Sequence, residues 1–95
     1  MSGARANAHF VYLAQTADGA YYCGYAIDPA SRIRAHNAGK GAKILRGKTP
    51  VRLSFARRFS TKEAALSYEA SLKRRSHAFK LTLSRRWSRL RKRKA

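Results

Sequence analysis

Five side chains of this sequence have the chemistry that hydrolysis of a phosphodiester requires. That reaction needs an activated water, positive charge on the phosphoryl oxygens and help for the leaving oxygen. Arginine offers a bidentate donor to phosphate oxygens, and tyrosine or histidine can accept a proton from water. A carboxylate can hold a hard divalent cation such as Mg²⁺. The candidate catalytic residues are Tyr12, Tyr22, Arg32, His36 and Glu69.

Either Tyr12 or His36 could activate the water. Tyrosine is a poor base at its usual pKa of about 10, but a neighbouring Arg32 and a metal ion would lower that pKa. Histidine titrates near neutral pH without perturbation, and His36 could also relay a proton for Tyr12. The residue types allow all three assignments.

Glu69 is the acidic residue that local structure does not explain. The chain has 22 lysines and arginines against 4 acidic residues. Asp18 suits a turn, Asp28 a helix N-cap and Glu63 the first turn of a helix. Glu69 lies mid-helix beside an apolar stripe, where an unpaired carboxylate is costly. An ion pair with Lys73 at i+4 would account for it, and so would a bound metal ion.

A hairpin over residues 9–26 is expected to position both tyrosines. Two runs of β-branched and aromatic residues bracket an Asp-Gly pair. A two-residue loop would pair Tyr12 with Tyr25 and put Tyr12 and Tyr22 on opposite faces. A three-residue loop at 17–19 pairs Tyr12 with Gly24 and puts both tyrosines on one face. The second loop also leaves room beside the Tyr12 ring, so the proposed site requires it.

A helix that begins at Asp28-Pro29 is expected to carry the arginine and the histidine. Aspartate is a favoured N-cap and proline a favoured first helical residue. The helix should end near residue 37. Arg32 and His36 then share one face, one turn apart.

The second half of the chain predicts one strand and two helices. Residues 51–58 alternate in part and indicate a third strand. A Ser60 capping box should begin a helix that carries Glu69 and runs to about residue 75. A helical stretch follows at 77–83. The basic segment 84–95 is expected to be either a helix or a frayed tail.

The segment 39–50 is expected to be a basic, glycine-rich loop with one short turn at 42–45. Its glycines would let the backbone approach a phosphate. The loop cations, an aromatic side chain that could stack on a base and two cations of the later helix are the candidate nucleic-acid contacts: Tyr25, Lys40, Lys43, Arg46, Lys48, Lys73 and Arg74.

Composition indicates a polyanionic partner. The formal net charge is +18 over 95 residues, which favours nucleic acid first and an anionic membrane surface second. A hydrophobic content of 44% argues against a disordered basic tail. No apolar run approaches a membrane span, and the N-terminus does not resemble a signal peptide. One cysteine and three scattered histidines suit a reducing cytoplasm and give no zinc spacing.

Taken together, these motifs resemble the GIY-YIG nuclease superfamily, and in particular its small stand-alone bacterial branch of the YhbQ-like, UPF0213 type, itself similar to the Slx1 nuclease domain. The resemblance covers about residues 9–83. It rests on Phe10-Val11-Tyr12, Tyr22-Cys23-Gly24, Asp28-x3-Arg32-x3-His36, the loop at 39–43 and Glu69. The first triplet departs from Gly-Ile-Tyr, and the asparagine that many relatives carry after the glutamate helix is absent.

The resemblance implies an α/β (α+β) fold, with a three-stranded, mostly antiparallel sheet flanked by helices. It implies one Mg²⁺ or Mn²⁺ ion held by Glu69, with Arg32 as the catalytic arginine, and it favours Tyr12 as the base. The implied reaction is hydrolysis of DNA that leaves 5′-phosphate and 3′-hydroxyl ends.

Two functions follow from these observations. The first is a metal-dependent DNA endonuclease acting on single-stranded, branched or flap DNA, since the chain has no room for a separate recognition domain. The alternative is a non-catalytic module that binds DNA or structured RNA. We expect a flexible segment at 1–8, a nuclease domain at 9–83 and a basic end at 84–95. A monomer without a small-molecule cofactor or membrane contact, cytoplasmic and associated with the nucleoid, completes the expectation.

Overall fold

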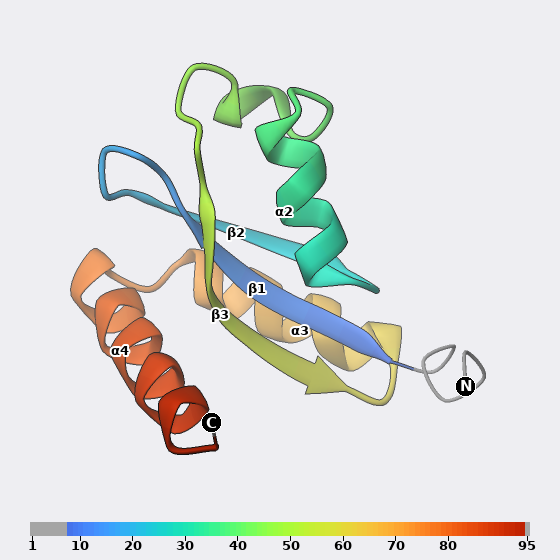
Figure 1. Cartoon of the computed structure of the whole chain (residues 1–95). Coiled ribbons are helices and arrows are strands. Elements are labelled where there is room, and N and C mark those ends of the chain that lie inside the picture. Colours follow the sequence, from blue (N-terminus) through green and yellow to red (C-terminus); the bar gives the residue numbers. More distant parts are fainter. Residues whose placement is uncertain (1–7, 95) are drawn as a thin grey trace.

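The computed structural model describes residues 8–94, so nearly all of the predicted flexible segment 1–8 lies outside the described residues. Three strands form one antiparallel sheet in the order β2-β1-β3. Their bounds are His9–Gln15 for β1, Tyr21–Ala26 for β2 and Arg52–Phe59 for β3. The predicted α+β class is confirmed, with the first strand at the centre of the sheet (Figure 1).

The β1–β2 loop has the geometry that the site requires. The Thr16 N–H donates to the Ala20 carbonyl at 2.9 Å, which leaves three residues in the loop. Gly19 has a φ of +92°, a conformation that glycine adopts without a steric penalty. Tyr12 therefore lies opposite Gly24, and the three-residue loop is confirmed.

The helices lie on both sides of the sheet. On one side are α2 (Pro29–Asn37) and the short 3₁₀ helix η1 (Lys43–Leu45). On the other side are α3 (Lys62–Lys73) and α4 (His77–Lys94) (Figure 1). The predicted stretch at 77–83 and the basic segment that follows it form one continuous helix through residue 94.

One helix begins where the sequence predicts it, and one begins a residue later. The Asp28 side chain accepts a hydrogen bond from the Ser31 N–H at 3.2 Å and caps α2. The predicted Ser60 capping box is wrong. Thr61 caps α3 instead and accepts from the Ala64 N–H at 3.1 Å. Because the chain still turns away from β3 at Ser60, Glu63 becomes the second helical residue and is out of register for a capping box.

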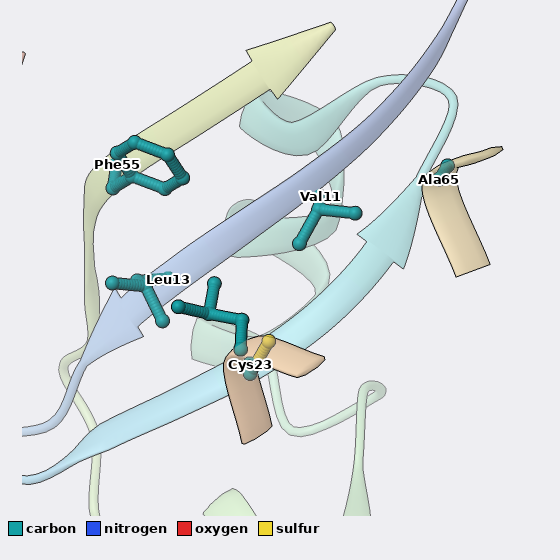
Figure 2. Packing of buried hydrophobic residues seen from close by; sticks show 6 residues of the cluster. Val11, Leu13, Cys23, Phe55 and Ala65 are labelled. Carbon is teal, nitrogen blue, oxygen red and sulfur yellow. The ribbon is translucent and has the colours of Figure 1, made fainter. Parts of the chain in front are cut away.

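The sheet separates two apolar clusters. Figure 2 shows the larger cluster, which α3 and α4 cover, and its fully buried members include Val11 and Leu13. The smaller cluster lies under α2 and η1 and contains Tyr12, Leu45 and Val51. Side chains alternate along β1, so Tyr12 faces α2 while its two neighbours face α3.

Candidate active site

Tyr12, Tyr22 and His36 form a compact aromatic group beneath α2. The ring centroids of Tyr12 and Tyr22 are 6.3 Å apart, and the His36 ring lies 6.3 Å from Tyr12 and 5.6 Å from Tyr22. Tyr12 is 1% exposed and His36 is 3% exposed. Two strands and a helix thus bring together three of the five predicted catalytic side chains.

Gly24 makes the space that the Tyr12 side chain occupies. A Cβ at position 24 would lie 2.6 Å from both the Cζ and the hydroxyl oxygen of Tyr12. Real Cβ atoms do not make such contacts, so a larger residue would displace the ring. The position of the Tyr12 side chain therefore requires a glycine at residue 24.

The hydrogen bonds of His36 define its tautomer. The Ala42 N–H donates to Nδ1 at 3.2 Å, so Nδ1 carries no proton. In a neutral imidazole the proton then belongs on Nε2. Nε2 lies 3.0 Å from the Tyr12 hydroxyl oxygen and donates to it. Neither ring nitrogen retains a free lone pair.

The glycine-rich loop holds this histidine. A Cβ at Gly41 would lie 1.8 Å from His36 Nδ1, so the loop backbone passes directly against the imidazole ring. The sequence suggested that these glycines allow close approach to a phosphate. At Gly41 the group that approaches is His36, and the next residue, Ala42, supplies the hydrogen bond.

Burial dominates the pKa values of the hydrogen-bonded pair. Desolvation raises the pKa of Tyr12 well above its usual range, the Tyr22 and Glu69 charges add to the increase, and Arg32 opposes it. The expected net lowering of the Tyr12 pKa by Arg32 is therefore not found in the protein alone. Burial also lowers the pKa of His36, and Arg32 lowers it further, so His36 is neutral at pH 7.

Arg32 lies on the exposed surface of α2, one turn before His36. Its charge influences the pKa of both Tyr12 and His36. It lines a pocket of about 280 Å³ together with Tyr25, Asp28 and Ser31. An exposed guanidinium beside a buried tyrosine is placed to meet an anion that arrives from solvent.

Glu69 comes to the site from the other side of the sheet. It lies on α3, which packs against β1 and the edge strand β2, and its carbonyl accepts from the Cys23 thiol at 3.9 Å. Its side chain is 15% exposed and pairs with Lys73 at 3.4 Å. The predicted ion pair is therefore present. Because the carboxylate also raises the pKa of Tyr12, the two side chains interact electrostatically.

The donor set around Glu69 fits one type of metal site only. Within residues 8–94, no group of three or more histidine, cysteine, aspartate or glutamate side chains could enclose an ion. Mg²⁺ does not need such an enclosure, because it keeps several waters and binds one or two carboxylates together with substrate phosphate. The single, partly exposed carboxylate of Glu69 fits this mode of Mg²⁺ binding and does not fit a zinc site.

The predicted nucleic-acid contacts are distributed around the site. The four loop cations, Lys40, Lys43, Arg46 and Lys48, are all exposed near η1, and Arg74 is exposed at the end of α3. Tyr25 is not brought to the tyrosine pair. It packs on the α3 side of the sheet, where its hydroxyl group lies 2.7 Å from His9 Nδ1.

Asn37 is a positioning residue that no sequence motif indicates. Its side-chain amide donates to the Val51 carbonyl at 3.0 Å, and its carbonyl accepts from the Val51 N–H at 2.7 Å. These two bonds join the end of α2, one residue after His36, to the residue before β3. An asparagine at a helix end is a visible signal, but its partner lies 14 residues away.

Comparison with known proteins identifies the class. Residues 8–90 match the GIY-YIG catalytic domain family. The chain therefore belongs to the GIY-YIG nuclease superfamily. Between the end of β3 and the end of the match, the chain supplies the glutamate helix α3 and most of α4.

The relatives are small proteins named UPF0213. The chain is 47% identical over 66 residues to one from Streptococcus pneumoniae, covering 70% of this chain and 67% of that one. It is 44% identical over 81 residues to one from Aeromonas hydrophila, covering 82% and 60%. The solution structure of UPF0213 protein BH0048 from Bacillus halodurans is 41% identical, with a TM-score of 0.51 over 80% of this chain and 81% of that one. The chain thus spans about two thirds or less of the length of the first two relatives.

None of the helices between residues 8 and 94 combines the length and the apolar character that crossing a membrane requires.

Proposed function

We propose that this protein is a metal-dependent endonuclease that hydrolyses phosphodiester bonds in DNA and leaves 5′-phosphate and 3′-hydroxyl ends. The observation that carries the proposal is the buried hydrogen bond between Tyr12 and His36. A protein that only binds nucleic acid gains nothing from two buried polar side chains in this arrangement, because their desolvation costs free energy.

The tautomer of His36 favours Tyr12 as the general base. His36 has no free lone pair, since Nδ1 accepts from Ala42 and Nε2 is protonated. It acts as a positioning residue whose Nε2–H donates to the Tyr12 oxygen. A hydrogen bond donated to that oxygen is stronger when the oxygen is a phenolate, so it stabilises the form that accepts a proton from water.

In the protein alone, the electrostatics of the site oppose formation of the Tyr12 phenolate. Arg32 stabilises the phenolate form of Tyr12, whereas burial, Tyr22 and Glu69 oppose it. A metal ion bound to Glu69 would neutralise one of the charges that oppose the phenolate. A high pKa also makes the phenolate a strong base once it forms. Arg32, exposed at the mouth of the site, would donate to the non-bridging oxygens of the phosphate.

Glu69 would hold the metal ion together with water molecules and the substrate phosphate. When bound, Mg²⁺ or Mn²⁺ supplies charge stabilisation to the phosphoryl oxygens and the leaving 3′-oxygen. The Lys73 ammonium group would have to release the carboxylate, which costs little for a pair whose lysine is 58% exposed.

Single-stranded or branched DNA, including flaps, is the proposed substrate. The exposed cations near η1 suit contacts with backbone phosphates, which carry no sequence information. We propose that the protein acts as a monomer among the nucleic acid of the cytoplasm.

Cleavage of labelled single-stranded, duplex, flap and junction DNAs and of RNA, mapped at nucleotide resolution with Mg²⁺ or Mn²⁺, tests the proposal. Wild-type protein should cut single-stranded or branched DNA. Glu69→Ala should lose metal-dependent cleavage and retain DNA binding measured in EDTA. If the wild-type protein binds these DNAs but cuts none, the non-catalytic binding module replaces the nuclease.

A further inference from the structure

A second basic surface lies on the side of the sheet away from α2. It is a groove of about 610 Å³ between α4 and the ends of the three strands where β1 finishes and β2 and β3 begin. None of the five candidate catalytic side chains lines it. Figure 1 shows α4 across the sheet from α2, so this α4 groove and the tyrosine pair occupy opposite faces.

The α4 groove concentrates positive charge without compensating acids. Its cations are Arg52 from β3 and Arg85, Arg89, Arg91 and Lys92 from α4. Within residues 8–94 the one ion pair joins Lys73 to Glu69, so none of these five cations is neutralised. The sequence of α4 from His77 to Lys94 contains no acidic residue.

Two of these guanidinium groups are already held by neutral partners. Arg52 donates through Nε and Nη2 to the Gln15 side-chain oxygen, at 3.2 and 2.7 Å. The Arg91 guanidinium carbon lies 4.5 Å from the centroid of the Trp87 ring. Fixed guanidinium groups lose less conformational entropy when they bind an anion, and their neutral partners leave the positive charge intact.

A buried hydroxyl group in the same groove lacks a partner. The Tyr21 hydroxyl oxygen is shielded from solvent and forms no hydrogen bond, and Tyr21 lines the groove. An unsatisfied buried hydroxyl is costly. Movement of the side chains that shield it would let a phosphate oxygen in the groove accept its proton.

The packing of α4 distinguishes nucleic acid from a membrane surface as the partner. Membrane-surface helices need an apolar face that is free to enter the lipid. The apolar residues Phe79, Leu83 and Trp87 instead pack against the core, and a single exposed side chain, Leu90, does not form an apolar face. The cations Arg85, Arg89 and Lys92 follow one another along α4 over about 10 Å, which suits successive phosphates of an extended strand.

We propose that the α4 groove binds the sugar-phosphate backbone of single-stranded nucleic acid, as a site separate from the tyrosine pair. The groove volume falls within the range of pockets that enclose small molecules, roughly 300–1,000 Å³. A short stretch of one strand fits such a volume, whereas a duplex does not. A strand could therefore be held on one face of the sheet independently of any cleavage on the other.

Fluorescence anisotropy with labelled single-stranded oligothymidine in EDTA tests the site without cleavage. The double variant Arg85→Gln/Arg89→Gln removes two groove charges. The matched control Arg58→Gln/Arg86→Gln removes two exposed charges that do not line the groove. The groove variant should bind about tenfold more weakly, with its log–log salt slope reduced by about 1.4, because each single-strand phosphate contact contributes about 0.7. Equal losses in the two double variants would overturn the proposal.

Tyr21→Phe provides a second test, because this substitution removes the hydroxyl group and leaves the charge of the groove unchanged. It should weaken oligonucleotide binding about threefold to tenfold while leaving the unfolding midpoint unchanged or higher. Unchanged binding by this variant would count against the groove. Retained oligonucleotide binding by the groove variant, combined with lost binding to phosphatidylserine vesicles, would also overturn it. Each variant is also compared with wild type in the cleavage assay. Because binding is measured in EDTA, the binding result can be interpreted even if the protein proves not to be a nuclease.

Discussion

The Tyr12 hydroxyl oxygen and His36 Nε2 lie 3.0 Å apart, although 24 positions separate the two residues in the chain. His36 is the donor in this bond because the Ala42 backbone occupies its other nitrogen. The histidine therefore positions and supports the tyrosine.

Tyr12→Phe should abolish cleavage with little effect on DNA binding. The change removes the oxygen that accepts from His36, and loss of a general base typically costs about 10²–10⁴-fold in rate. Single-turnover cleavage at saturating protein measures the effect. Tyr68→Phe, a tyrosine that packs on Phe59 from α3, is the matched control and should cleave at the wild-type rate. Comparable rates for both variants would remove Tyr12 from the mechanism.

Gly41→Ala should reduce cleavage by displacing the His36 ring. The added Cβ would lie 1.8 Å from Nδ1, so the Ala42 bond and the contact with Tyr12 cannot both survive. We expect a loss of at least about tenfold in single-turnover rate, as one misplaced hydrogen bond costs about 1–3 kcal/mol. Gly19→Ala is the control for a glycine in a strained turn: it meets no atom within 4 Å and should lose stability alone. A Gly41→Ala variant with full activity would contradict the proposed role of the loop.

Lys73→Ala should strengthen Mg²⁺ binding. The variant frees the Glu69 carboxylate from its ion pair, so the ion no longer competes with the ammonium group. The increase in unfolding temperature with Mg²⁺ concentration measures the affinity, because a ligand that binds only the folded state stabilises it. Loss of the exposed pair should itself cost at most about 1 kcal/mol.

Lys62→Ala, in the first turn of the same helix, is the control for the charge removed. Its Mg²⁺ titration should match that of the wild type. If Lys73→Ala also matches, or if Glu69→Gln retains the Mg²⁺-dependent stabilisation, Glu69 serves as an ion-pair partner and does not hold the metal.

Protein stability should fall on acidification below about pH 6.5, the ordinary pKa of histidine. Burial and Arg32 lower the pKa of folded His36, so the unfolded chain takes up a proton that the folded chain resists. His36 therefore contributes its full stability above the unfolded pKa and loses it as the pH falls toward the folded pKa. Urea unfolding at several pH values measures this slope. The slope should be smaller in His36→Gln, and an unchanged slope would assign it to other groups.

Asn37→Ala should destabilise the fold by about 1–3 kcal/mol. The side chain makes two hydrogen bonds to the backbone of Val51, and no other group of the variant replaces them. Urea unfolding gives the free energy of unfolding. Ser67→Ala, an exposed change on α3, should alter it by no more than about 0.5 kcal/mol.

Most of the architecture can be predicted from short-range signals in the amino-acid sequence. An Asp-Gly pair between two β-rich runs predicts the hairpin, and Asp28-Pro29 predicts the start of α2, because both signals act within a few residues. The four-residue spacing places Arg32 and His36 on one face of that helix for the same reason. The scarcity of acidic residues singled out Glu69. These relationships are local, so they can be predicted from the order of residues along the chain.

The interactions among these residues depend on the tertiary structure. The sequence allowed either Tyr12 or His36 as the base, and packing resolved the geometry by bringing the Ala42 N–H to one nitrogen and Tyr12 to the other. Burial raises the pKa of Tyr12 and outweighs Arg32, which lowers it. The fold also places Gly41 against the His36 imidazole. Desolvation and hydrogen bonds between distant segments depend on how the sheet and helices close around a side chain. Residue spacing along the chain does not contain that information.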